Sequence, residues 1–222
     1  MYITVNGVQL YYEKNGEGRP LLLVHGNGED HTIFDEAAAV LKENYTCYAI
    51  DSRGHGLSSG VDVLHYEDMA DDLAAFIEAL DLQDVIYYGF SDGGILGLLT
   101  ALRTDRIKDM IISGTNLSPK GARPLVLAGI TLFADIAKDP KYIMMRDEPD
   151  IDPTDLHHIH ARTLVLAGEN DVIKESETLK IYANIPYAEV KILPQEGHGS
   201  YIVHSTKIAE LIDSFVKGGK RQ

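Results

Sequence analysis

The pattern of apolar and polar positions along the chain predicts alternating strands and helices. Short, continuous apolar runs are typical of parallel strands that are buried on both faces. Such runs occur at 21–24, 45–50, 85–88, 110–112, 164–166 and 190–193. Residues typical of helices, apolar at helical spacing or in one apolar run, fill 33–41, 69–80, 95–102 and 208–216. This alternation predicts an α/β fold with a mostly parallel sheet and helices on both faces.

The N-terminal residues follow a different pattern. Residues 2–5 and 8–12 alternate in character around Asn6-Gly7, a dipeptide that favours a two-residue hairpin turn because both of its residues tolerate positive φ. We therefore expect the chain to open with an antiparallel hairpin at one edge of the sheet.

The strand and helix alternation stops over about 116–155. Within this stretch, 125–136 has a helical pattern, 142–145 is apolar, and 147–153 is acidic and interrupted by prolines. An excursion of this size between two core strands is typical of a functional cover and not of a linker. We predict a single α/β domain over 1–222, with a small helical lid inserted at about 116–155.

Length and charge narrow the class of protein. The 222 residues, 45% of them hydrophobic, suffice for one domain that buries roughly 70% of its unfolded surface. Twenty Lys and Arg against thirty-four Asp and Glu give a net charge of −14, which repels nucleic acids and anionic membranes. The N-terminus lacks a basic region and a long apolar run, so we expect a cytoplasmic protein with no membrane partner. Cys47, the only cysteine, is expected to be a buried, inert thiol.

The strand predicted at 85–88 leads into Gly89-Phe90-Ser91-Asp92-Gly93. This G-x-S-x-G pattern is typical of a nucleophile elbow when it joins a strand to a helix, because the sharp turn exposes the serine hydroxyl. A serine needs a base to accept its proton, and histidine has a suitable pKa range. His198 follows the last predicted strand; His25 and His204 are poorer rivals because His25 belongs to a glycine-rich loop and His204 to the start of a helix.

The histidine in turn needs a carboxylate to fix its tautomer. Asp171 follows the strand predicted at 164–166, and Glu169 competes with it for this role. The strand at 110–112 ends without an acid nearby. An acyl-transfer site also needs N–H donors for the oxyanion. The backbone N–H groups of Asn27 and Asp92 are the candidates.

Five motifs make the chain resemble the α/β-hydrolases over almost its whole length. They are His25-Gly26-Asn27-Gly28, Asp51-Ser52-Arg53-Gly54-His55-Gly56-Leu57-Ser58, Gly89 to Gly94, Gly168-Glu169-Asn170-Asp171 and Gly197-His198. The resemblance implies a serine hydrolase that uses Ser91, His198 and Asp171, needs no cofactor, and cleaves a small carboxylic ester or lactone through an acyl-enzyme. The same residues are compatible with a thioester or C–C bond hydrolase, and the fold also hosts ligand receptors without enzymatic activity.

Other side chains near these motifs have expected roles in the site. Phe90, Tyr142, Met144 and Met145 are candidates for the substrate pocket, although the methionines are equally suited to packing the lid onto the core. Asp51, Arg53 and His55 are expected to order their loop.

Two further expectations concern metals and substrate charge. His157, His158 and His160 do not have tetrahedral metal spacing, so we predict no metal. Glu29, Asp30 and Asp92 would place negative charge at the mouth of the site and favour a neutral or cationic small-molecule ester. The sequence does not predict the oligomeric state.

Overall fold

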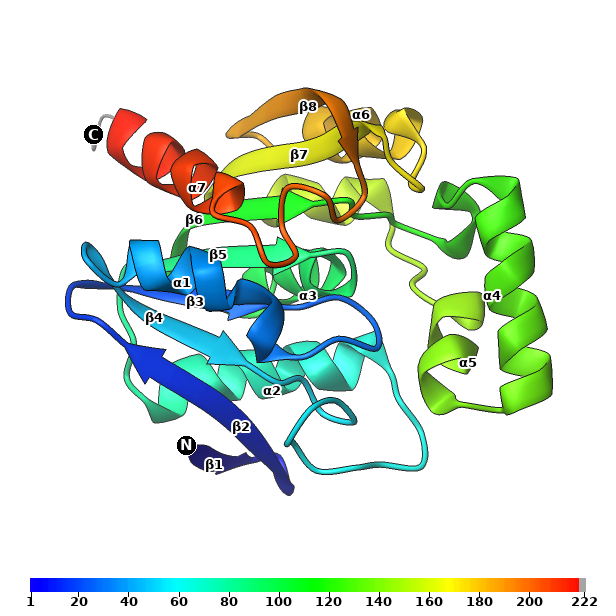
Figure 1. Cartoon of the computed structure of the whole chain (residues 1–222), viewed down its shortest axis with the longest axis horizontal. Coiled ribbons are helices and arrows are strands. Elements are labelled where there is room, and N and C mark those ends of the chain that lie inside the picture. Colours follow the sequence, from blue (N-terminus) through cyan, green and yellow to red (C-terminus); the bar gives the residue numbers. More distant parts are fainter. Residues whose placement is uncertain (220–222) are drawn as a thin grey trace.

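The computed structural model describes residues 1–219, and its centre is one eight-stranded sheet with the order β1-β2-β4-β3-β5-β6-β7-β8 (Figure 1). The strands are β1 (Tyr2–Val5), β2 (Val8–Asn15), β3 (Arg19–Val24), β4 (Tyr45–Ile50), β5 (Val85–Phe90), β6 (Ile107–Ser113), β7 (Arg162–Asn170) and β8 (Ala188–Gly197). Each predicted apolar run lies inside one of them. β1 and β2 form the expected antiparallel hairpin, and β2 also pairs antiparallel with β4. The remaining pairs are parallel, which confirms the predicted fold class.

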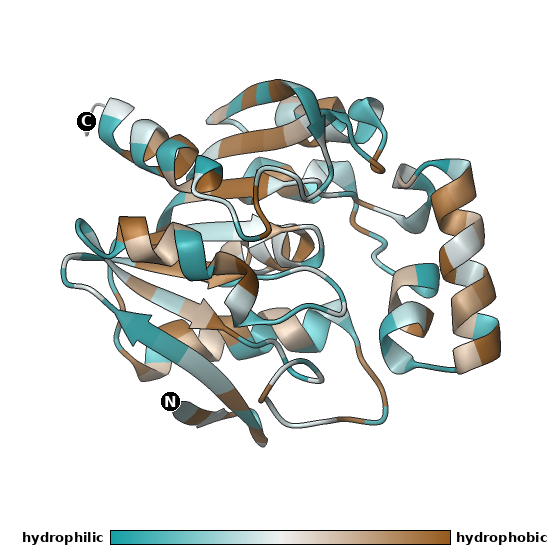
Figure 2. Cartoon of the chain, viewed as in Figure 1, coloured by the Kyte–Doolittle hydropathy of each residue, from teal (hydrophilic) through white to brown (hydrophobic). Residues whose placement is uncertain are grey.

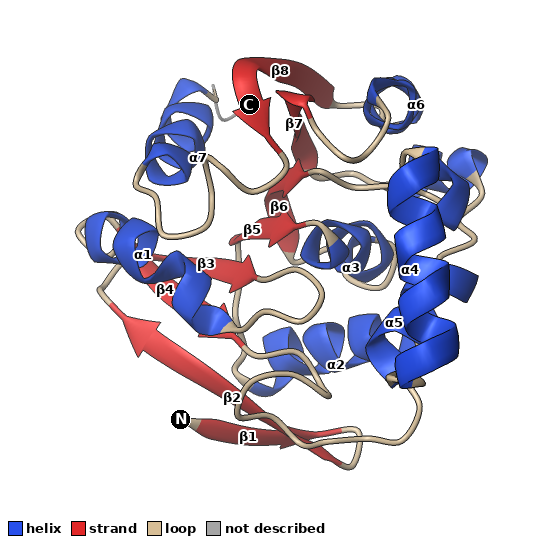
Figure 3. Cartoon of the chain, turned by 45° about the vertical axis from the view of Figure 1, so that its right-hand side comes forward, coloured by secondary structure: helices blue, strands red, loops and turns tan. Residues whose placement is uncertain are grey.

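Helices cover both faces of the sheet (Figure 3). They are α1 (Asp35–Leu41), α2 (Tyr66–Ala79), α3 (Asp92–Ala101), α4 (Pro124–Ala137), α5 (Pro140–Asp147), α6 (Glu175–Asn184) and α7 (Lys207–Gly218), with 3-10 turns η1 (His31–Phe34), η2 (Pro119–Gly121) and η3 (Pro153–His158). Along β5, Ile86 and Tyr88 pack with α1 and α7 in one apolar cluster, whereas Val85 and Tyr87 pack with α2, α3 and α6 in the other. Burial on both faces explains why the central strands carry continuous apolar runs.

The insertion segment, residues 116–155, contains α4 and α5. These two antiparallel helices lie beyond the end at which the parallel strands finish (Figure 1). The start of the insertion is tied to the loop after β7: Ala122 forms an isolated antiparallel bridge with Ile173, and the Arg123 N–H donates to the Val172 carbonyl at 2.8 Å. Near its end, the Glu148 carboxylate accepts a hydrogen bond from the Tyr66 N–H at 3.1 Å. Among residues 1–219, no helix has the length and apolar character needed to cross a membrane.

Candidate active site

Ser91 occupies the sharp turn between β5 and α3. Its backbone has φ 53° and ψ −113°, a conformation that side chains rarely adopt and that is found mainly where function requires it. The flanking glycines are needed for steric reasons, because a Cβ at Gly89 would overlap the Gly93 carbonyl and a Cβ at Gly93 would overlap the Val24 carbonyl. The Ser91 N–H donates to the Ser113 carbonyl at 2.8 Å and fixes the turn against β6. This geometry is that of the nucleophile elbow expected from the sequence.

Ser91, His198 and Asp171 lie in a hydrogen-bonded row. His198 Nε2 is 3.0 Å from Ser91 Oγ, and His198 Nδ1 is 2.7 Å from Asp171 Oδ1. The Phe90 ring packs against the His198 imidazole with 4.9 Å between centroids. Glu169 does not compete, because its exposed carboxylate accepts the Gln195 N–H at 2.8 Å instead.

The surroundings of Asp171 keep it ionised. Its side chain is buried, and burial by itself would raise its pKa. Hydrogen bonding and charge interaction with His198, together with hydrogen bonds from the Ile173 and Gly168 N–H groups, outweigh burial and lower the pKa of this carboxyl below its usual range. An ionised Asp171 accepts the Nδ1–H of His198, which leaves the Nε2 lone pair for the Ser91 hydroxyl.

The peptide that carries the Asn27 N–H is held by its carbonyl. Gly26 O accepts a hydrogen bond from His25 Nδ1 at 2.7 Å and a longer one, 3.4 Å, from the Glu29 N–H. Because N–H and C=O of a trans peptide point in opposite directions, fixing the carbonyl also fixes the Asn27 N–H. Complete burial, with a neighbouring His55, lowers the pKa of His25 to about 4, so the ring is neutral and Nε2 accepts the Ser52 N–H at 3.1 Å.

The other candidate oxyanion donor, the Asp92 N–H, lies in the first residue of α3. Within residues 1–219, no acceptor takes a hydrogen bond from the backbone N–H of Asn27 or Asp92. Both donors are therefore available to a substrate oxygen, as a helix N-terminus allows.

The Asp92 side chain is buried beside Ser91. It accepts a hydrogen bond from Asn27 Nδ2 at 2.9 Å. Burial raises the pKa of Asp92, and the neighbouring Asn27 and Tyr66 side chains only partly offset this rise. Among the described ion pairs, none places a Lys or Arg on this carboxylate. The site thus contains a buried acid whose polar partners are neutral.

The three predicted acidic residues differ in their surroundings. Asp30 accepts hydrogen bonds from the Thr32 N–H and hydroxyl and thereby caps η1. Glu29 is partly buried and accepts the Gly26 N–H at 2.9 Å. Its carboxylate lies close to Ser91, since a Cβ added to Gly26 would lie 2.8 Å from Glu29 Oε2 and 3.1 Å from Ser91 Cβ. Burial raises the pKa of Glu29.

A cavity of about 50 Å³ lies over Ser91 and His198 beneath the insertion segment. It is lined by Tyr66, Ser91, Asp92, Asn116, Pro119, Ala122, Val126, Ile130, Met145, Glu148, Val172, Ile173 and His198. Of the predicted pocket residues, only Met145 belongs to this lining. Phe90 supports the imidazole, Tyr142 stacks on Phe133 between α5 and α4, and Met144 is buried in the core.

Sequence reasoning missed most of the lining. Tyr66, Asn116 and Ile173 come from a helix start and two loops that are separated by dozens of residues in the chain. No local pattern distinguishes these residues from ordinary core or loop positions. Only the end-of-strand position of Asn116 and Ile173 offered a signal, since ligands of parallel sheets bind at that edge.

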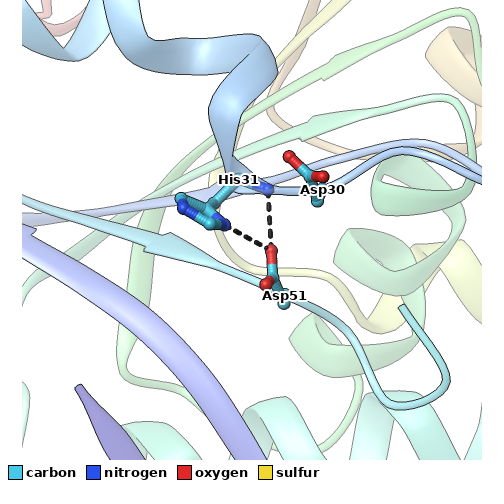
Figure 4. Close-up of side chains that lie close together, drawn as sticks. All are labelled: Asp30, His31 and Asp51. Atoms are coloured by element: carbon cyan, nitrogen blue, oxygen red, sulfur yellow. Dashed lines mark hydrogen bonds and ion pairs between the residues drawn. The ribbon is translucent and has the colours of Figure 1, made fainter. Parts of the chain in front are cut away.

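The cluster of Asp30, His31 and Asp51 is the one group with metal-ligand spacing in residues 1–219 (Figure 4). Its donors are already engaged within the chain. Asp51 Oδ1 accepts hydrogen bonds from His31 N and Nδ1, each at 2.7 Å, and Asp51 Oδ2 accepts the Leu57 N–H at 2.8 Å. The cluster ties the loop after β4 to η1, which is the ordering role expected of Asp51. The predicted non-ligands His157, His158 and His160 are exposed.

Comparison with known proteins agrees with this architecture. A family profile described as the alpha/beta hydrolase fold matches residues 19–148. An esterase from Exiguobacterium antarcticum superimposes with a TM-score of 0.81 at 24% identity over 97% of this chain and 98% of the esterase. The fold and the arrangement around Ser91 define the class of protein. The chain belongs to the α/β-hydrolase fold family.

Relatives of known sequence include several hydrolases. The mouse serine hydrolase BPHL is 25% identical over 248 residues, which cover 97% of this chain and 85% of the mouse protein. A cis-3-alkyl-4-alkyloxetan-2-one decarboxylase from Shewanella oneidensis is 31% identical, over 57% of this chain and 42% of that enzyme. This chain therefore spans less than half the length of that relative.

Proposed function

We propose that this protein is a serine hydrolase that cleaves a small carboxylic ester or lactone through an acyl-enzyme. The observation that supports this most directly is the row Ser91 Oγ, His198 Nε2, His198 Nδ1 and Asp171 Oδ1, with separations of 3.0 and 2.7 Å. These distances are those of a nucleophile, a general base and an orienting carboxylate. The esterase and serine hydrolase among the relatives support the same class of reaction.

In the proposed reaction, Ser91 Oγ attacks the acyl carbon while His198 Nε2 takes the hydroxyl proton. The carbonyl oxygen becomes an oxyanion and accepts hydrogen bonds from the N–H groups of Asn27 and Asp92. When the tetrahedral intermediate collapses, the alkoxide leaves with the proton from His198, and the acyl group remains on Ser91. A water molecule then attacks the acyl-enzyme, gives one proton to His198, and releases the carboxylic acid and the serine hydroxyl.

The size of the cavity favours a short acyl group. A cavity of about 50 Å³ is several times smaller than the roughly 300–1,000 Å³ of pockets that hold drug-sized ligands, so little room is available beside Ser91 for an acyl group. Val126 and Ile130 of α4 and Met145 of α5 form part of its lining. A longer acyl chain has to displace these helices, which is the role of a lid. We therefore propose that kcat/KM falls as the acyl chain lengthens.

The charges in the site favour neutral or cationic substrates. Asp92 lines the cavity, and Glu29 lies beside the nucleophile with its pKa influenced by both His198 and Asp92. A buried carboxylate without a cationic partner stabilises a positive group placed near it and repels a negative one.

The test is a series of p-nitrophenyl esters from acetate to octanoate, assayed with the wild-type chain and with Ser91→Ala. We expect turnover of the acetate, a decline with chain length, and a burst of p-nitrophenol equal to the enzyme concentration if deacylation is slow. Binding of the esters that raises the unfolding temperature without any turnover would favour a receptor. Undiminished turnover by Ser91→Ala would refute the proposed mechanism. Hydrolysis of thioesters or of C–C bonds in preference to esters would retain Ser91 but change the substrate class.

A further inference from the structure

Helix α4 has two apolar faces, and the insertion segment covers only one of them. Ala134 is buried, while Val126 and Ile130 face the cavity. The opposite face is open to solvent: Leu125 is 89% exposed, Leu132 58% and Ile136 72%. Hydrophobic positions recur along the whole of α4, the outermost helix at this end of the molecule (Figures 2 and 3). Exposed apolar surface of this extent is typical of an interaction site.

The residues on the open face of α4 follow one another at the same intervals whether the helix is read from its N-terminus or from its C-terminus. Leu125, Gly129, Leu132 and Ile136 follow one another at intervals of four, three and four residues, which places them in one stripe along the helix. A Cβ added at Gly129 would meet no atom within 4 Å, so this position is a gap in the stripe. Because the intervals are palindromic, a second α4 packed antiparallel aligns its Leu132 with this gap and its Ile136 with Leu125.

The charges beside the stripe are also self-complementary. A hollow of about 690 Å³ runs along one flank of α4, with Lys120 and Lys174 at its N-terminal end and Asp135 at its C-terminal end. Neither lysine forms an ion pair within residues 1–219. Asp135 pairs with Arg146 and remains 61% exposed. An antiparallel second copy brings its Asp135 over Lys120 and Lys174, and it also opposes the two helix dipoles.

We propose that the chain forms a two-fold symmetric dimer through an antiparallel α4–α4 contact centred between residues 130 and 131. A two-fold symmetric pair buries the same surface on both subunits, so the apolar stripe and the hollow of one chain are enough to form a closed dimer. An anionic lipid surface is the less favoured occupant, because the chain carries a net charge of −14 and Asp135 flanks the stripe.

The proposal predicts which positions meet their own symmetry mates. With Gly129 opposite the partner's Leu132, the two copies of Leu132 are three residues apart along the helix, about 4.5 Å at roughly 1.5 Å per residue. The two copies of Leu125 are eleven residues apart, about 16 Å by the same rise. A disulfide needs Cα atoms within about 4.4–6.8 Å. Helix axes about 8 Å apart leave roughly 3–4 Å sideways between facing Cα atoms, so the full Cα separation is about 5–6 Å for the two copies of Leu132 and more than about 16 Å for those of Leu125. The natural thiol, Cys47, is buried and does not interfere.

The experiment therefore uses Leu132→Cys and, as its matched control, Leu125→Cys, both oxidised with copper phenanthroline at micromolar protein. We expect a cross-linked dimer from Leu132→Cys and at least tenfold less from Leu125→Cys. A mixture of Leu125→Cys with Ile136→Cys should restore the cross-link. Equal cross-linking of both single variants, or efficient cross-linking of Leu125→Cys alone, would refute the antiparallel register.

A second measurement tests the dimer without cysteines. Sedimentation equilibrium should give twice the chain mass for the wild type and one chain mass for Leu132→Glu. Leu179→Glu, which changes an apolar residue of α6 that is 43% exposed, should leave the dimer intact. A monomeric wild-type chain would overturn the proposal. So would a monomer that cosediments with phosphatidylserine vesicles through α4, because this result would make an anionic lipid surface the occupant.

Discussion

Gly114 offers a way to displace the His198 ring without touching the three residues of the proposed mechanism. It follows β6 with φ +62°, and a Cβ built on it lies 2.6 Å from His198 Cε1 and 2.7 Å from His198 Nδ1. Ordinary van der Waals contact begins near 3.4 Å. The Gly114→Ala substitution therefore forces the imidazole to move by about 0.8 Å (3.4 − 2.6) or forces the backbone after β6 to shift.

The expected loss of activity follows from this displacement. A misplacement of about 1 Å in a reacting group costs roughly 10²-fold in rate. The His198 ring is held at 3.0 Å from Ser91 and 2.7 Å from Asp171, so a shift of this size breaks one of the two hydrogen bonds. We expect kcat for a p-nitrophenyl ester to fall about a hundredfold. The positive φ adds a strain of about 1–2 kcal/mol, which lowers the unfolding temperature by roughly 2–8 °C.

Gly7→Ala is the matched control. Gly7 has φ +79° in the hairpin turn between β1 and β2, and a Cβ there meets nothing within 4 Å. This variant should lose stability to a similar degree and keep its kcat. Both variants are assayed for kcat and for thermal unfolding. If Gly114→Ala retains wild-type kcat, or if Gly7→Ala loses as much kcat as Gly114→Ala, the packing of His198 against Gly114 does not limit the reaction.

The remaining predictions concern Ser91 and the residues around it. Ser91→Ala should lower kcat by about 10⁴-fold or more with the fold intact by circular dichroism, and adding His198→Ala should cost little more because the two act in one step; additive losses would contradict a shared step. Asn27→Ala should lower kcat/KM for a neutral ester less than tenfold, since the backbone N–H remains, whereas a loss of several kcal/mol in activation free energy would show that the side chain acts directly. Asp92→Asn should reduce the preference for a cationic over an isosteric neutral ester by up to about a hundredfold, because unit charges about 6 Å apart at an effective dielectric near 20 interact by roughly 3 kcal/mol. The pKa of Asp92 is raised by burial, so the part of this preference that Asp92 supplies should fade as pH drops through that pKa, whereas the Asp92→Asn variant should keep only the part that Glu29 supplies; an unchanged preference in the variant would exclude Asp92 as its source.

The sheet could be predicted from the sequence because its central strands are buried on both faces. A strand such as β5 must be apolar at consecutive positions, and this requirement leaves a local signal. Helix α6 was missed for the converse reason. Its buried positions are Glu177, Thr178 and Ile181, so only one of them is apolar and no stripe is visible. Glu177 is buried because its carboxylate accepts the Leu117 N–H, a tertiary contact without a local pattern.

The candidate site likewise contains residues that a local sequence pattern predicts and residues that it does not. Ser91 was predictable because the sharp turn demands glycines at fixed offsets, and its partners because they follow strands that end at the same edge of the sheet. The pocket was not predictable. Met144 and Met145 are neighbours in α5, and neighbouring helical side chains point about 100° apart, so one enters the core and the other the cavity. The tertiary packing of α5 decides which of the two methionines faces the core and which faces the cavity, and the local sequence does not predict this packing.

The short bridge between the start of the insertion and the loop after β7 has a consequence for engineering. Residues 121–123 are joined to 172–174 by backbone hydrogen bonds, and the Ile151 N–H donates a hydrogen bond to the Leu117 carbonyl at 2.9 Å. Both ends of the insertion are therefore held by backbone hydrogen bonds. At one of these attachment points, the loop that holds the insertion, residues 172–174, directly follows Asp171 in the chain. Replacing α4 and α5, from Pro124 to Asp147, with the corresponding helices of another hydrolase leaves both attachment points intact. We therefore expect such an exchange to change which substrates are accepted without disturbing the loop that carries Asp171. An exchange that begins before Gly121 removes the hydrogen bonds between residues 121–123 and 172–174. We expect it to destabilise the loop that carries Asp171 as well as the insertion segment.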